Sequence, residues 1–197
     1  MLCSVCSLNT HRYEEAYQRL PQNLVLGSET SSTVSSRGVY KFPAERKADA
    51  KNEDYQPSSY DLEYCSWSNI PDIDFALADD HQWTLGQFVW TGFDYLGEPS
   101  PYDTDAWPNH SSMFGIIDLA SLPKDQYYLY RSVWNKQAET LHILPHWNWE
   151  VREGKEAGTL ELQVTAKGLK SEKTQICLAA FLLRGIFLIL YIKDNYF

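Results

Sequence analysis

The sequence has few cysteines and none of the short motifs that mark most metal and cofactor sites. Its 197 residues contain 4 Cys, and Cys3 and Cys6 form a CxxC near the start. Four cysteines are too few for a dense disulfide framework. The CxxC has no strand before it and no second pair, so we favour neither a zinc site nor a thioredoxin-like redox site. Walker loops, GxGxxG, GxSxG and HExxH patterns are also lacking, so we expect no cofactor and no metal.

Positive charge is scarce as well, whereas aromatic side chains are abundant. The chain has 17 Lys and Arg against 26 Asp and Glu, which gives a formal net charge of -9. This balance argues against a protein that tracks nucleic-acid phosphates, so we expect no nucleic-acid partner. Aromatic residues make up 14%, including 7 Trp and 13 Tyr. Such a content suits a protein that offers flat apolar faces to a ligand, or a core built from large side chains.

The chain does not open with a basic stretch followed by a long apolar run. We therefore expect no signal peptide at this end, and the cellular location stays unknown. One long apolar run lies near the other end, over 176–192, and is interrupted by Arg184 and Gly185. It is short for a membrane span, and a central arginine is costly there. We favour a buried strand or helix, or an additional tail, over a transmembrane helix.

Helical and strand patterns alternate in the first part of the chain. Apolar residues recur at helical spacing before Pro21, and Leu24-Val25-Leu26 is a short apolar run that Gly27 closes. A run of this kind is typical of a strand buried on both faces, as in a parallel sheet covered by helices. The alternation predicts the α/β class. The predicted elements are helices over 11–20 and 72–83 and from Pro123, and strands over 24–26 and 86–90, with long loops over 44–61 and 100–112.

The pattern changes near residues 138 to 140. Residues 140–144 read as a strand, 159–165 alternate strictly like a half-buried strand, and 173–178 can return as its partner. This part therefore resembles a piece of an all-β module. The predicted organisation is an α/β part over 1–138, an all-β part over 139–178 and an apolar tail of unknown status over 179–197.

Two side chains at the ends of the predicted parallel strands are the leading candidates for chemistry. Glu29 follows Gly27, and functional side chains in barrels of parallel strands lie at this strand end. A carboxylate there can attack an anomeric carbon, although many such residues are only caps or solvated. Trp90 ends the second strand, where its indole can stack on a sugar ring or belong to the core. Asp94 and Glu98 follow closely and either bind sugar hydroxyls or are solvated loop residues.

Several long stretches, in order, resemble glycoside hydrolase family 2, in particular its β-galactosidase-like members. The resemblance runs from about residue 9 to 154. The matching stretches are GSETSS (27–32) with SRGVY (36–40), YDLEY (60–64), GQFVWTGFDYLGEP (86–99), FGIID (114–118) and LHILPHWNW (141–149).

The resemblance implies an O-glycosyl hydrolase that retains configuration and needs no cofactor. We expect it to act on terminal β-galactosides, and the alternatives are glucuronides and other glycosides on which family members also act. Its implied fold is a partial (β/α)8 TIM barrel, made of the last two strands and their helices, followed by the start of a β-sandwich. Glu29 takes the nucleophile position, and Trp90 takes that of an aromatic wall of the sugar subsite. Asp94 and Glu98 are the further substrate-binding candidates.

Two departures from the family pattern bear on activity. The family's acid/base glutamate lies in an Asn-Glu pair before the nucleophile, whereas Asn52-Glu53 follows Glu29. The earlier strands of a barrel of roughly 250 residues also have no counterpart here. We therefore expect a chain that is inactive alone, and that needs the missing barrel part or associates with itself through exposed strand edges. The alternatives are a non-catalytic carbohydrate-binding module and a non-functional remnant.

Overall fold

The computed structural model describes residues 6–7, 10–19, 21, 23–98, 100, 102, 111–144, 160–167 and 188–194. The chain divides into two compact units, 1–124 and 125–197, and each is described by itself. This division falls earlier than the change of pattern near residue 138. The helix that begins after Pro123 therefore groups with the C-terminal strands.

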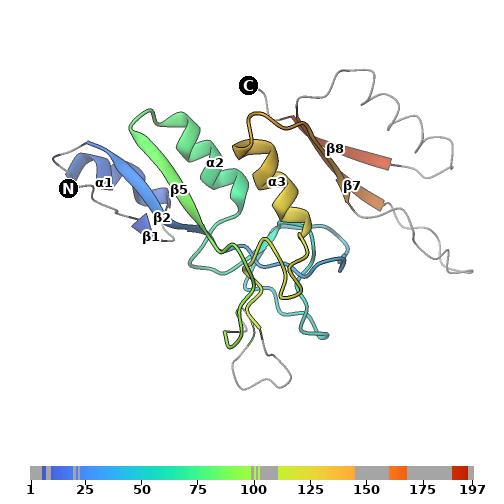
Figure 1. The fold of residues 1–197 in the computed structure, drawn as a ribbon. Coiled ribbons are helices and arrows are strands. Elements are labelled where there is room, and N and C mark those ends of the chain that lie inside the picture. The colour runs from blue at the N-terminus through green and yellow to red at the C-terminus, as the bar shows by residue number, and fades with distance from the viewer. Residues whose placement is uncertain are drawn as a thin grey trace, which may run out of the picture. The chain divides into compact units, whose positions relative to one another are not determined.

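A parallel sheet organises the N-terminal unit (Figure 1). Its strands are β1 (Cys6–Ser7), β2 (Val25–Ser31) and β5 (Thr84–Trp90), in the order β1-β2-β5. Both pairings are parallel, as the alternating pattern predicted. Ser31 lies opposite Trp90, so the carboxyl ends of β2 and β5 meet at one edge of the sheet. The register of this pair shifts between Val25 and Leu26 and again between Gly27 and Thr30.

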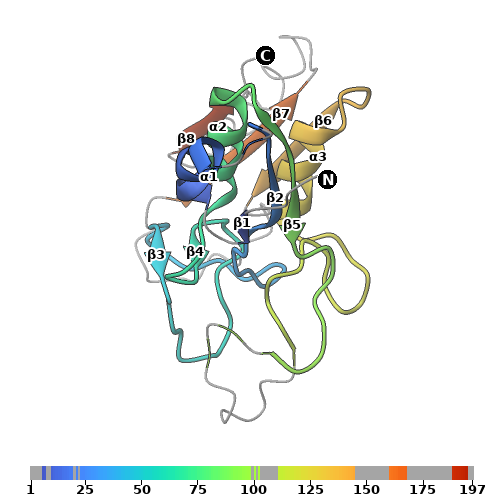
Figure 2. The same ribbon diagram turned by 90° about the vertical axis from the view of Figure 1, so that its left-hand side faces the viewer.

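Two short helices pack on one side of this sheet, as Figure 2 shows. They bury an apolar core because each helix presents apolar residues at helical spacing. The core consists of Tyr13, Ala16 and Val25, with Tyr17, Leu77 and Trp83 packed against it. The helical elements are the 3-10 turn η1 (Thr10–Arg12), α1 (Tyr13–Arg19) and α2 (Pro71–Asp80).

Irregular segments lie beyond the carboxyl ends of β2 and β5. The first contains β3 (Lys47–Ala48), which pairs in parallel with β4 (Glu63–Tyr64). Around these two short strands the predicted loop over 44–61 is irregular, as expected. A second core lies in these segments. It consists of Val34, Cys65 and Phe114, with Trp90, Tyr95 and Met113 packed against it.

The chain that leaves β5 runs alongside residues 111–117. Backbone hydrogen bonds tie the two segments together: the N–H of Asp94 donates to the carbonyl of Ile117, and the N–H of Ser112 to that of Tyr95. Gly115 permits this approach, because a Cβ at that position would lie 2.1 Å from the Asp94 nitrogen. The direction of the chain after Trp90 is therefore set by contacts with a segment that lies later in the sequence.

The C-terminal unit combines one helix with a small sheet. Tyr128 of the helix stacks on His142 at 3.9 Å between ring centroids, and the His142 Nε2 lies 2.5 Å from Asp125 Oδ1. The first two strands pair antiparallel and the last two in parallel. The unit is thus mixed α and β. Its elements are α3 (Asp125–Trp134), β6 (Thr140–Leu144), β7 (Leu160–Lys167) and β8 (Leu188–Asp194), in the sheet order β6-β7-β8.

The predicted strand over 140–144 is confirmed by β6, whereas the predicted return strand over 173–178 lies outside the described residues. The end of the apolar run 176–192 falls in β8. Among the residues that the structure describes, no helix is long and apolar enough to cross a membrane.

Candidate functional site

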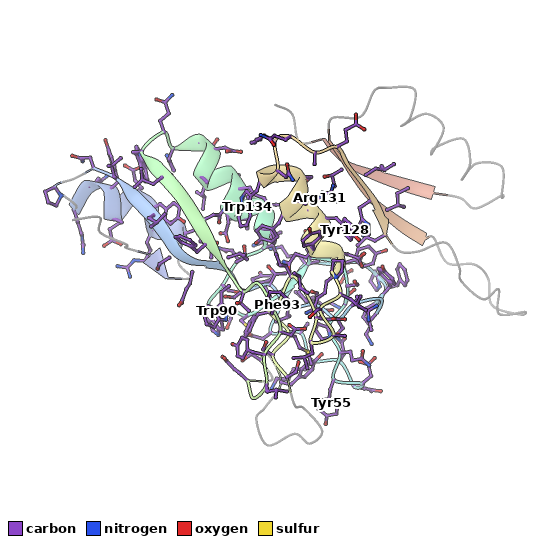
Figure 3. The ribbon with its side chains drawn as sticks, viewed as in Figure 1. Tyr55, Trp90, Phe93, Tyr128, Arg131 and Trp134 are labelled. Carbon is purple, nitrogen blue, oxygen red and sulfur yellow. The ribbon has the colours of Figure 1, made fainter. Side chains whose placement is uncertain are left out.

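Glu29 and Trp90 come to the same end of the same sheet, on strands that pair directly. Glu29 lies within β2, which continues to Ser31, so the expectation that the strand ends before Glu29 is wrong. The apolar run marked only the first half of the strand, because pairing with β5 extends β2 through polar residues. Trp90 is the last residue of β5 (Figure 3). Both side chains are half-buried, and the Trp90–Thr91 peptide bond is cis.

A buried carboxyl group fixes the end of β2 immediately after Glu29. Asp74 of α2 accepts hydrogen bonds from the hydroxyls of Thr10, at 2.7 Å, and Ser31, at 2.8 Å. Asn69 in turn donates to the Thr10 hydroxyl, at 2.7 Å. Burial raises the pKa of Asp74, and the hydrogen bonds from Thr10 and Ser31 oppose this shift. The end of β2 is thereby tied to η1 and α2.

The backbone at this point is in an uncommon conformation. Ser31 and Ser32 both have positive φ angles, of 63° and 54°. Residues other than glycine rarely adopt this left-handed region, and such residues cluster at functional sites. The hydrogen bond from Ser31 to Asp74 and the bond from the Asn69 N–H to the Ser31 carbonyl, at 3.1 Å, stabilise the turn.

Trp90 contacts Tyr95, five positions along the chain. The two rings meet edge to face, with centroids 5.9 Å apart and an interplanar angle of 76°. The Tyr95 hydroxyl donates a hydrogen bond to the Glu98 carboxylate. Burial, followed by the hydrogen bond to Glu98, raises the pKa of Tyr95 to about 12. Glu98 itself is exposed, at the outer end of this chain of contacts.

Asp94 forms a buried ion pair with Lys124. The Lys124 Nζ lies 2.7 Å from Asp94 Oδ2 and also donates to the Ser35 carbonyl, at 2.7 Å. The other oxygen, Oδ1, accepts from Lys124 at 2.9 Å and from the Gly115 N–H at 2.8 Å. Burial raises the pKa of Asp94 and lowers that of Lys124. Asp94 thus orders the loop after β5, and its contact with a sugar stays a prediction.

The structure also shows the surroundings of the Asn52-Glu53 pair and of Cys65. Asn52-Glu53 lies in the loop between β3 and β4, where the Asn52 side chain donates to the Glu63 carboxylate at 3.3 Å. Cys65 is buried, and burial raises the pKa of its thiol to about 12, which keeps it protonated and unreactive. Within the part of the chain that the structure describes, no group of three or more His, Cys, Asp or Glu could hold a metal ion.

Comparison with known proteins decides the family. Over 137 residues, 66% of this chain, the sequence is 42% identical to the β-galactosidase BoGH2A of Bacteroides ovatus. The chain carries a segment of glycoside hydrolase family 2. A second relative, described as a putative β-glucuronidase of Formosa agariphila, is 43% identical over 68 residues, 34% of this chain. The segment spans only 16% of the first of these relatives and 6% of the second. No family model matches the sequence.

Solved structures with some similarity to this family 2 segment are also β-glucuronidases. That of Parabacteroides merdae, determined with glycerol in its active site, aligns with a TM-score of 0.43 and 17% identity, over 74% of this chain and 18% of that one. β-Glucuronidase 3 of Bacteroides uniformis aligns with a TM-score of 0.41 and 21% identity, over 70% and 17% of the two chains.

Proposed function

We propose that this chain supplies the nucleophile side of a retaining β-glycosidase site. Glu29 is the nucleophile, and Trp90 is the wall of the sugar subsite. The observation that supports this most directly is the pairing of β2 with β5, because it brings these two residues to one sheet edge. In a (β/α)8 barrel, functional side chains extend from the carboxyl ends of the strands. In this proposal β2 and β5 are the last two strands of a partial barrel.

The proposed reaction has two displacements at the anomeric carbon. The Glu29 carboxylate attacks that carbon, and the bond to the leaving oxygen breaks, which leaves a glycosyl ester on the enzyme. Water then attacks the same carbon and releases the Glu29 carboxylate. A second carboxyl group normally protonates the leaving oxygen, and such general acid catalysis contributes about 10²–10⁴-fold. Because Asn52-Glu53 does not take that position, we propose that this chain alone does not turn over ordinary glycosides.

We propose terminal β-galactosides as the substrate. The relative that matches the longer stretch, over 137 residues, is a β-galactosidase, whereas the one described as a β-glucuronidase matches over 68 residues. Trp90 suits such a sugar because an indole face can contact the ring C–H groups without a charged partner.

The test detects the nucleophile without requiring a general acid. The purified chain is incubated with 2,4-dinitrophenyl 2-deoxy-2-fluoro-β-galactoside, whose leaving group departs without protonation. We expect intact mass spectrometry to show one added fluorogalactosyl group, which peptide mapping places on Glu29. Glu29→Gln should abolish the label, whereas Glu53→Gln, a change at an exposed loop residue, should leave it intact.

Two further measurements address the substrate and the lack of turnover. The corresponding fluoroglucuronide should label the chain more slowly than the fluorogalactoside, and the reverse order would contradict the galactoside proposal. With 4-nitrophenyl β-galactoside we expect negligible release of nitrophenol. A steady rate that Glu29→Gln abolishes would show that the chain is a complete catalyst. A wild-type chain that is never labelled, or is labelled on another residue, would refute the role of Glu29.

A carbohydrate-binding role without chemistry is the second candidate. It is favoured by exposed aromatic residues near this end of the sheet: Phe93 follows Trp90, and Trp67 packs against Phe114 of the second core. Galactose binding followed by NMR distinguishes the two roles. Binding that survives Glu29→Gln unchanged, in a wild-type chain that is never labelled, would favour the binding module.

A further inference from the structure

We propose that Asp74 is a positioning residue for Glu29, which it holds in place through Ser31. Ser31 follows Glu29 by two positions and is the residue of β2 that pairs with Trp90. Asp74 lies on α2, and its Oδ2 accepts a hydrogen bond from the Ser31 hydroxyl at 2.8 Å. This inference rests on the proposed function, because it concerns how the nucleophile of that site is held.

Each oxygen of the Asp74 carboxyl group has a partner on a different element. Oδ2 bonds the Ser31 hydroxyl of β2, and Oδ1 accepts from the Thr10 hydroxyl of η1 at 2.7 Å. Thr10 in turn accepts from the Asn69 amide at 2.7 Å. Asp74, Thr10 and Ser31 are all buried, so water cannot replace a partner that is removed. The carboxyl group therefore joins the end of β2 to two helical elements at a fixed distance.

The backbone at Ser31 needs such an anchor. Ser31 and Ser32 have φ angles of 63° and 54°, a region that residues other than glycine keep only where their surroundings enforce it. Two hydrogen bonds hold Ser31 there, one from its hydroxyl to Asp74 and one from the Asn69 N–H to its carbonyl. Without the Asp74 carboxyl, we expect the end of β2 to relax toward ordinary extended backbone. The Glu29 carboxylate, two residues earlier on the same strand, would then move.

The sugar wall is held by other contacts. Trp90 packs against the second core, and the N–H of the next residue, Thr91, donates to the Phe114 carbonyl at 3.3 Å. The loss of Asp74 should therefore displace Glu29 while Trp90 keeps its place. Such a displacement lowers the rate at which the nucleophile attacks a bound sugar more than it weakens the binding of that sugar.

The labelling reaction with the fluorogalactoside measures these two quantities separately when the reagent concentration is varied. Asp74→Ala should lower the limiting rate about 10- to 100-fold and leave the concentration that gives half of it nearly unchanged. Ser31→Ala, which removes one donor, should lower the limiting rate about five- to tenfold. Asp74→Asn should restore most of the rate, because its amide offers an acceptor and a donor and a hydroxyl can serve as either.

A variant that destabilises the same unit elsewhere is the matched control. Ala16→Gly weakens α1 and the first core without touching the end of β2, and it should keep the wild-type limiting rate. The double variant Asp74→Ala, Ser31→Ala should be labelled no more slowly than Asp74→Ala, because both changes remove the same hydrogen bond. If Asp74→Ala does not fold, Ser31→Ala decides the matter, since it removes only a hydroxyl group.

The outcomes distinguish this inference from the proposed function. A wild-type chain that is never labelled refutes the proposed function. A wild-type chain that is labelled at the same limiting rate as Ser31→Ala refutes the role of Asp74 alone. Equal slowing in Ala16→Gly would show that lower stability, and not a displaced nucleophile, slows labelling, and it would also overturn the inference.

Discussion

At the scale of single residues, the most informative group near the site is the carboxyl of Asp74. It is fully buried and held by neutral donors from Thr10 and Ser31, with Asn69 bonded to Thr10. Burial raises its pKa above the ordinary value of 3.8. A carboxyl group whose pKa is higher in the folded state stabilises the fold in its protonated form. Its contribution is complete below the unfolded pKa and is lost as pH rises through the folded pKa.

The first stability prediction follows from the raised pKa of Asp74. As pH rises from about 3 toward 7, the free energy of unfolding of the wild type should fall relative to Asp74→Asn, which cannot ionise. Urea unfolding of both chains at each pH measures the difference. Asp79→Asn, at an exposed position of the same helix, is the control for the loss of a carboxyl group that is not buried. A difference between wild type and Asp74→Asn that does not change with pH would mean that Asp74 ionises at its ordinary pKa.

The places of candidate site residues could be predicted from the sequence where a local motif marks them. Their hydrogen-bond and ion-pair partners could not be predicted where those partners lie far along the chain. The apolar runs before Glu29 and Trp90 predicted two neighbouring parallel strands, which the pairing of β2 with β5 confirms, although β2 continues two residues beyond Glu29. The partner of Asp94 is Lys124, and that of Ser31 is Asp74, and no local pattern connects either pair. The contacts of Tyr95 with Ser112 and with the second core could not be predicted for the same reason.

At the scale of elements, β2 approaches α1 closely enough to require glycine. A Cβ on residue 27 would lie 2.3 Å from the Tyr13 hydroxyl and 2.6 Å from Thr30 Cγ2. Both neighbours are buried and cannot move aside freely. Gly27→Ala should therefore lower the free energy of unfolding by about 1–3 kcal/mol, the usual cost of overpacking. Gly92→Ala is the matched control, because nothing lies within 4 Å of its Cβ position.

Thermal or urea unfolding of the two alanine variants decides this prediction. Gly92→Ala should be neutral or slightly stabilising, since alanine restricts the unfolded chain. If Gly27→Ala unfolds at the same denaturant concentration as wild type, the packing of α1 on β2 is looser than the structure shows. The double variant Gly27→Ala, Tyr13→Phe should recover part of the lost free energy of unfolding, because phenylalanine lacks the hydroxyl oxygen that lies closest to the new Cβ.

The predicted boundaries of helices and strands agree with the structure where a single hydrophobic pattern covers the whole element. They differ where pairing with another strand extends the element beyond that pattern. Strand β6 has the predicted limits, and α2 and β5 begin close to theirs. Strand β2 continues through Glu29 because β5 pairs with it, although its second half is polar. The sequence pattern predicted an all-β C-terminal part, whereas α3 belongs to the same compact unit as β6, β7 and β8. The compact units are defined by spatial contacts, which the sequence pattern does not reveal.

At the scale of the whole molecule, the sheet β1-β2-β5 has open edges among the residues that the structure describes. The outer strand β5 also exposes Leu85, at 51%, and Phe88, at 64%. An open strand edge with apolar side chains invites pairing with another chain. We propose that this edge is completed in one of two ways: by a polypeptide that carries the preceding part of the family 2 enzyme, or by further copies of this chain.

For the purified chain alone, the second outcome is the expected one. Sedimentation velocity over a concentration series should show oligomers that grow with concentration, because no other polypeptide is present to cover β5. Phe88→Lys should shift the population toward monomer, since a charge on an edge strand opposes pairing. Leu122→Lys adds the same charge at a loop residue of comparable exposure, 46%, and should leave the oligomers unchanged. A wild-type chain that sediments as a single monomer and unfolds cooperatively would show that β5 is covered within the chain itself, and the need for a completing partner would then disappear.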